Sequence, residues 1–176
     1  MAATHTDDTP TSAGPSRRLP LATAELECRL EEEVSRAERH GTALSCLLVG
    51  LQDPAGLARA HGSQLPEQAI AYMSLALGRQ LRRFDRVGRL PGGQLLVLLP
   101  GADQRRGEIV ARRAIRRLRA VKLEQDGERH TIAVRVGLAS WREGVSAREL
   151  VEQSRRAACA AAAASERRRQ TPPGAS

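Results

Sequence analysis

The chain has 176 residues, enough for one domain of ordinary size with short extensions and too few for two full domains. Apolar residues make up 41% of it and aromatic residues only 2%, so a buried core must be built from aliphatic side chains. The net charge of +8 is carried by 27 arginines and one lysine, Lys122. This charge suits phosphate-bearing partners, but the shortage of aromatic side chains argues against a surface that stacks single-stranded bases.

The ends of the chain and its cysteines exclude several classes of protein. Residues 1–20 lack the apolar block of a secretion signal, and we expect them and residues 169–176 to form disordered tails. No apolar run is long enough to cross a membrane, so we expect a cytoplasmic protein. The cysteines and histidines form no cluster typical of a disulfide framework or a metal site. We interpret three residues as small buried apolar side chains: Cys28, Cys46 and Cys159.

Hydrophobic periodicity predicts helices around one strand in the first half of the chain. Residues Leu21–His40 have apolar residues at helical spacing and end at Gly41, which suits a left-handed cap. The apolar run Leu44–Leu51 indicates a buried strand. A short helical segment at Gly56–His61 and a longer helix at Pro66–Leu81 are expected next.

A hairpin is predicted near the middle of the chain. Strands at Arg86–Leu90 and Leu95–Pro100 flank the turn Pro91–Gln94. The next segment, Gln104–Val121, has the spacing of a helix with one apolar face and one arginine-rich face. Residues Thr131–Leu138 then alternate as a strand does.

The last element predicted is a helix with a recognisable start. Ser146 and Glu149 form a capping box, and we extend the helix through the alanine run Ala157–Ala164. Helices and strands alternate along the chain with short connections. This order predicts an α/β (α+β) fold with one sheet covered by helices.

Three segments together resemble the GGDEF domain family, the diguanylate cyclases that join two GTP molecules into cyclic di-GMP, a bacterial second messenger. They are RVGRLPGGQLLVLLP at the hairpin, TIAVRVGLAS at the late strand and SARELVEQSRRAACAAAA at the closing helix. The resemblance covers residues 21–168, which we take as one degenerate GGDEF-like domain. It implies a single mixed β-sheet covered by helices, with a ferredoxin-like βαββαβ core similar to that of nucleotidyl cyclases.

The resemblance also implies where a metal would bind, and those positions carry no acid. The metal-binding aspartate of the first strand falls on Gly50, and the two acids of the hairpin motif fall on Gly93 and Gln94. Sliding the hairpin by one residue places Gln94 and Leu95 there instead. Positions that contact guanine or phosphate in the family are altered as well: Ala55, Ala58 and Ala162. Because Mg²⁺ on a triphosphate needs anionic oxygen ligands, we predict no metal, no cofactor, no catalytic residues and no enzymatic activity.

A second feature of the family is retained. Many members carry an Arg-x-x-Asp motif that binds the product, and Arg82 and Asp85 match it, five residues before the hairpin turn. The arginine that completes this pocket in the family falls on Arg113. Two arginines match the two negative charges of a cyclic dinucleotide, and Asp85 can accept the N–H donors of guanine. The resemblance therefore implies a cyclic di-GMP receptor or regulatory module in signal transduction that acts on a separate effector protein.

Several alternatives stay open. Arg82 and Asp85 are also compatible with an incidental surface ion pair of little energetic value. The segment Gln104–Val121 carries seven arginines against Glu108, so a scaffold that meets an acidic protein partner without binding nucleotide is the main alternative. Binding to the phosphate backbone of nucleic acid is a weaker one. Whether the chain forms a homodimer is left open.

Overall fold

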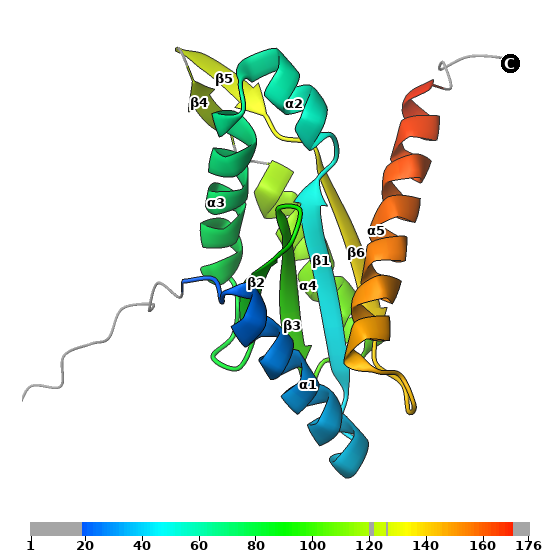
Figure 1. Cartoon of the computed structure of the whole chain (residues 1–176). Coiled ribbons are helices and arrows are strands. Elements are labelled where there is room, and N and C mark those ends of the chain that lie inside the picture. The colour runs from blue at the N-terminus through cyan, green and yellow to red at the C-terminus, as the bar shows by residue number, and fades with distance from the viewer. Residues whose placement is uncertain (1–18, 120–121, 126, 171–176) are drawn as a thin grey trace, which may run out of the picture.

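A four-stranded sheet lies between two pairs of helices in the computed structural model of the chain (Figure 1). The structure describes residues 19–119, 122–125 and 127–170, so residues 1–18 and 171–176 of the predicted tails lie outside the described residues. The elements are, in chain order, α1 (Thr23–His40), β1 (Leu44–Leu51), α2 (Pro54–His61), α3 (Gln64–Gly78), β2 (Arg86–Leu90), β3 (Gln94–Pro100), α4 (Gln104–Arg119), β4 (Lys122–Gln125), β5 (Glu128–Thr131), β6 (Val134–Ser140) and α5 (Ala147–Gln170). The last helix thus includes the first two residues of the predicted C-terminal tail.

The strand order confirms the predicted fold class. The main sheet has the order β2-β3-β1-β6, and helices α3 and α4 connect β1 to β2 and β3 to β6. This is the order of a ferredoxin-like βαββαβ core. All three pairs of neighbouring strands are antiparallel. We expected a mixed sheet, and for the pairing of these strands that expectation was wrong. Among the described residues, parallel pairing is confined to an isolated bridge between Leu21 and Gly88.

A second, two-stranded sheet was not predicted. β4 and β5 pair as an antiparallel hairpin, which Figure 1 shows beside α2 at one end of the main sheet. Their sequences, KLEQ and ERHT, lack the alternating apolar residues that indicate a strand. Thr131, expected to begin the late strand, therefore belongs to β5, and β6 begins at Val134.

The central strand β1 separates two apolar cores. All eight of its residues are buried, because helices cover both faces of the sheet. Leu47, Val49 and Leu51 pack with α3 and α4 on one face. Residues of the opposite parity pack with α1 and α5 on the other face: Leu44, Cys46 and Leu48.

The prediction that all three cysteines are buried was only partly correct. Cys46 is buried in β1, and burial raises the pKa of its thiol well above the ordinary value. Cys28 and Cys159 are exposed, since they lie on the solvent side of α1 and α5. A small apolar character alone does not decide which side of a helix a cysteine occupies.

Most helix boundaries follow the predicted signals. Gly41 has φ of 60° at the end of α1, and Ser146 and Glu149 form the predicted capping box at the start of α5. The helix α3 begins at Gln64 instead of Pro66, because proline is tolerated within a first helical turn. The same helix ends at Gly78, three residues before the predicted end at Leu81. The residues after Gly78 form the connection to β2, and this connection contains the Arg-x-x-Asp segment.

Candidate functional site

The segment from Arg82 to Asp85 is a tight turn between α3 and β2. The Arg82 carbonyl accepts a hydrogen bond from the Asp85 N–H at 3.2 Å, which is the closing bond of a β-turn. In the opposite direction, the Arg82 N–H donates to Asp85 Oδ2 at 2.8 Å. Asp85 is only 6% exposed, and a buried carboxylate needs such donors. The aspartate therefore fixes the backbone from which the Arg82 side chain leaves.

The residues around this turn border a cavity of about 560 Å³. Phe84 stands at its edge with 72% of its surface exposed, unusual for one of only three large aromatic residues in the chain. The Arg86 guanidinium donates to the carbonyls of Arg83 and Asp85, at 2.7 and 2.9 Å, and so stiffens the turn. Arg82 does not line the cavity, whose wall includes Phe84 and Asp85. Phe84 was not singled out from the sequence, although its rarity was a usable signal.

Arg113 lies on α4, in a different element from the turn. Its side chain is exposed, and within the described parts of the chain it makes no hydrogen bond or ion pair with Arg82 or Asp85. The helices α3 and α4 pack on the same face of the sheet, so Arg113 and the turn that follows α3 belong to one side of the molecule. The structure thus brings Arg82 and Asp85 together and leaves Arg113 separate from them.

Two arginines from neighbouring elements lie beside the end of β1 and the hairpin turn. Gly50 pairs with Arg135 of β6, and a Cβ at position 50 would lie 3.5 Å from both Arg135 Nε and Gln94 Cγ. Arg135 Nε is buried and has no hydrogen-bond partner within the part of the chain that the structure describes. The Arg155 Nε–H donates to Gln94 Oε1 at 3.3 Å. Glycine and a neutral amide beside two guanidinium groups do not fit a Mg²⁺ ion, which requires anionic oxygen ligands.

The remaining aligned positions around this turn do not form a compact polar site. Ala55 and Ala58 lie in α2, whose first turn is capped by Asp53 Oδ1, which accepts the Gly56 N–H at 2.7 Å. Glu67 of α3 forms an ion pair with Arg89 of β2. This pair joins α3 to the hairpin strand and satisfies both charges.

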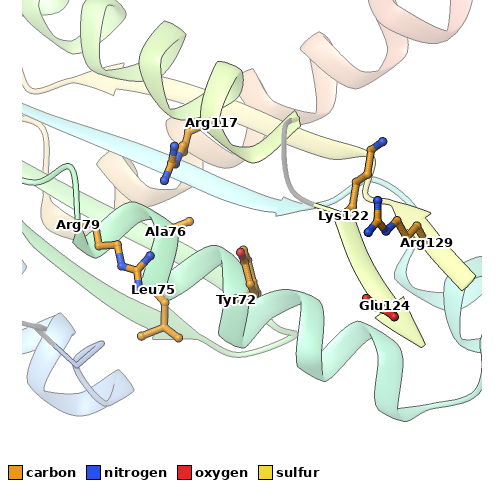
Figure 2. Close-up of a pocket in the computed structure, with 8 residues that line it drawn as sticks. All are labelled: Tyr72, Leu75, Ala76, Arg79, Arg117, Lys122, Glu124 and Arg129. Atoms are coloured by element: carbon orange, nitrogen blue, oxygen red, sulfur yellow. The ribbon is translucent and has the colours of Figure 1, made fainter. Parts of the chain in front are cut away.

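A second cavity, of about 460 Å³, lies between α3, α4 and the β4–β5 hairpin (Figure 2). Its wall contains four cations and one carboxylate, together with an exposed tyrosine and two apolar residues: Tyr72, Leu75, Ala76, Arg79, Arg117, Lys122, Glu124 and Arg129. The sequence did not reveal this site, because its members come from four elements and form no local motif. Among the helices that the structure describes, none has the length and apolarity needed to cross a membrane.

Comparison with known proteins identifies a family. The family described as "Diguanylate cyclase, GGDEF domain" matches residues 23–168. Among solved structures, the diguanylate cyclase SiaD of Pseudomonas aeruginosa, in complex with its activator SiaC, has a TM-score of 0.78 at 23% identity. That alignment covers 85% of this chain but only 59% of the SiaD chain. No curated protein sequence matches the chain.

Two further structures have the same fold over nearly their whole length. The GGDEF domain of DgcB from Caulobacter crescentus, in complex with c-di-GMP, has a TM-score of 0.73 at 20% identity, covering 93% of this chain and 94% of that one. The GGDEF domain of PA1120 (YfiN or TpbB) from Pseudomonas aeruginosa has a TM-score of 0.75 at 22% identity, covering 82% and 91%. At these identities the likeness shows the fold.

The family match corrects one prediction made from the sequence. We expected no enzymatic activity, because Gly50, Gly93 and Gln94 occupy positions of acids. The match over residues 23–168 contradicts that expectation, since the matched family consists of diguanylate cyclases, which are enzymes. The residues at these three positions determine which ligand atoms are available there for a metal. They do not by themselves decide whether the chain is an active enzyme.

Proposed function

Because the chain belongs to the GGDEF domain family, we propose that it binds cyclic di-GMP as a regulatory module, through the turn that carries Arg82 and Asp85, with Arg113 as a further contact. The observation that carries this proposal is the buried Asp85 carboxylate, which accepts the Arg82 N–H at 2.8 Å and orders the turn in advance of binding. The related GGDEF domain of DgcB was solved in complex with c-di-GMP, which supports the same ligand here.

The chemistry of the three residues suits a cyclic dinucleotide. The guanidinium of Arg82 offers a planar set of donors that pairs with phosphate oxygens or with the acceptor edge of guanine. A carboxylate has two oxygens and accepts several hydrogen bonds, so Asp85 can hold its turn and also accept guanine N–H groups. Phe84, 72% exposed beside Asp85, offers a ring on which a base can stack.

Arg113 acts in this proposal as the second positive charge. It projects from α4 on the side of the sheet that α3 also covers, and its side chain is long and exposed. A bound ligand with two phosphates would draw Arg113 toward the turn, and each phosphate would then have one guanidinium partner. Binding is favourable in this proposal because the two negative phosphates come to lie between the Arg82 and Arg113 guanidinium groups.

Isothermal titration calorimetry of the full chain with cyclic di-GMP tests the proposal. Saturable binding is expected, and Arg82→Ala should weaken it about tenfold or more, as loss of a charge-assisted contact implies. Arg116→Ala is the matched control, because Arg116 is an exposed arginine of the same helix as Arg113 without a role in the proposal. No heat with ligand in the hundreds of micromolar, or equal affinity of Arg82→Ala and the wild type, would contradict it.

Recognition of an acidic protein partner is the second candidate function. All seven arginines of α4 have exposed side chains, and of these only Arg112 forms an ion pair within the described residues, with Glu108. A helix with such a face attracts acidic surfaces at long range. A poly-glutamate peptide that binds at physiological salt, together with no cyclic di-GMP binding, would favour this function over the first.

A further inference from the structure

We infer that the cavity between α3, α4 and the β4–β5 hairpin is a second ligand site, which binds a purine nucleoside polyphosphate without a divalent metal. It is separate from the Arg82–Asp85 turn and does not depend on the function proposed above, because the two cavities have no described lining residue in common. We call the eight described residues that line this cavity the polyphosphate pocket.

The charge of the polyphosphate pocket is its first distinguishing property. Arg79 follows α3, Arg117 lies in the last turn of α4, and Lys122 and Arg129 lie on β4 and β5. Among the lining residues that the structure describes, Glu124 is the single carboxylate. Within the described parts of the chain, none of the four cations forms a hydrogen bond or an ion pair through its side chain. Cations gathered around one cavity repel one another, and a multiply charged anion relieves that repulsion.

The arrangement of the cations also points to a ligand within the cavity. Figure 2 shows Arg117 reaching from α4 toward α3, and Lys122 and Arg129 standing on the hairpin at the other side of the space. The four cationic residues therefore come from the end of α3, from α4 and from the hairpin, and do not extend along one helix. This geometry fits a compact chain of phosphates better than an extended acidic surface.

The apolar part of the pocket indicates that the ligand also carries a ring. Tyr72 is 47% exposed and Leu75 42% exposed, although large apolar side chains are few on this surface. Both lie on α3 beside Ala76, which is buried. A purine can stack on the tyrosine ring, and Glu124 can accept an exocyclic N–H. A volume of about 460 Å³ is within the range of small-ligand sites.

The chemistry of the wall explains why no metal is required. A divalent cation on a polyphosphate needs protein carboxylates or water, and the described part of this wall offers one carboxylate against four cations. The guanidinium and ammonium groups themselves neutralise the phosphate charge. Binding should therefore persist in a metal chelator.

Calorimetry of the full chain with ATP in excess EDTA tests the inference, and ATP is the probe because GTP is the substrate of the family. Saturable binding is expected, weakened at least tenfold by Arg117→Ala and unchanged by Arg116→Ala, which neighbours it outside the pocket. Tyr72→Leu should reduce the affinity for ATP and leave that for inorganic tripolyphosphate unchanged. The substituted residues are exposed, and circular dichroism checks that each variant is folded.

The outcomes separate this inference from the proposed function. Arg117→Ala should keep its affinity for cyclic di-GMP, and Arg82→Ala should keep its affinity for ATP. No binding of ATP to the wild type would overturn the inference, as would an equal loss in the Arg116→Ala control. Equal affinity for ATP and tripolyphosphate would overturn the assignment of a nucleoside. Binding of poly-glutamate that Arg117→Ala weakens and Arg116→Ala does not, together with no binding of ATP, would assign the pocket to an acidic peptide instead.

Discussion

The residue Gly50 lies beside a buried guanidinium nitrogen, Arg135 Nε, that has no hydrogen-bond partner among the described residues. Arg135 Nε lies 3.5 Å from the position that a Cβ at residue 50 would take. Gly50→Asp would bring a carboxylate to this nitrogen, and an added charge-assisted bond contributes about 1.5–3 kcal/mol. We expect Gly50→Asp to be more stable than Gly50→Asn, its neutral isostere, in urea unfolding. If the aspartate variant is the less stable of the two, Arg135 does not supply the positive charge at this position.

The capping box at α5 makes a pH-dependent contribution. The pKa of Glu149 is lowered from its ordinary value, chiefly because the backbone N–H of Ser146 donates to it at 3.0 Å, and also because the Ser146 hydroxyl does. A lowered pKa in the folded state means that this contribution is present above the pKa of the unfolded chain and is lost as pH falls through the folded one. Glu149→Gln should therefore lower the melting temperature at pH 7, and the difference from wild type should shrink in acid. An equal difference at pH 7 and pH 3 would contradict this.

At the scale of elements, the contact between β6 and α5 depends on a missing side chain. A Cβ at Gly137 would lie 2.1 Å from the Ser154 carbonyl oxygen and 2.2 Å from the Ala158 nitrogen, both backbone atoms of α5. The helix would have to move, so Gly137→Ala should cost about 3 kcal/mol or more in unfolding free energy. Gly50→Ala is the matched control on β1, with ordinary contacts at 3.5 Å. Similar unfolding midpoints for the two variants would show that α5 shifts without cost.

The elements also show how far local patterns predict this fold. The strand Leu44–Leu51 was predicted with its bounds, because a fully buried strand has a continuous apolar sequence. The β4–β5 hairpin was missed, since its pairing is between short polar segments and is stabilised by the backbone. The early end of α3 was missed as well. The chain leaves the helix to form a turn held by the Asp85 carboxylate, and the burial of that carboxylate cannot be read from helical periodicity.

At the scale of the whole molecule, the predicted and the unpredicted sites differ in how they are assembled. Arg82 and Asp85 are three residues apart, so a motif could identify them, whereas the contribution of Arg113 remains a prediction. The polyphosphate pocket joins α3 to a hairpin about 50 residues later, and only the tertiary fold brings them together. Part of the net charge of +8 therefore lies around this cavity, and not only on the solvent-exposed faces of helices.

Ligand binding should also stabilise the whole chain. A ligand that binds only the folded state contributes about 2.7 kcal/mol at a concentration 100 times its dissociation constant. For a chain of this size, we expect cyclic di-GMP to raise the melting temperature by about 5–10 °C. Differential scanning fluorimetry measures this shift, with Arg82→Ala as the comparison at the same ligand concentration. An equal shift in Arg82→Ala would place the ligand elsewhere.

The central claim is that cyclic di-GMP binds at the turn ordered by Asp85. Its most direct test is the affinity of Asp85→Asn for cyclic di-GMP, because the amide oxygen of asparagine can still accept the Arg82 N–H while the charge that receives guanine is removed. In calorimetry, we expect saturable binding of cyclic di-GMP to the wild type and at least tenfold weaker binding to a folded Asp85→Asn variant. Equal affinities, or no binding to the wild type, would contradict it.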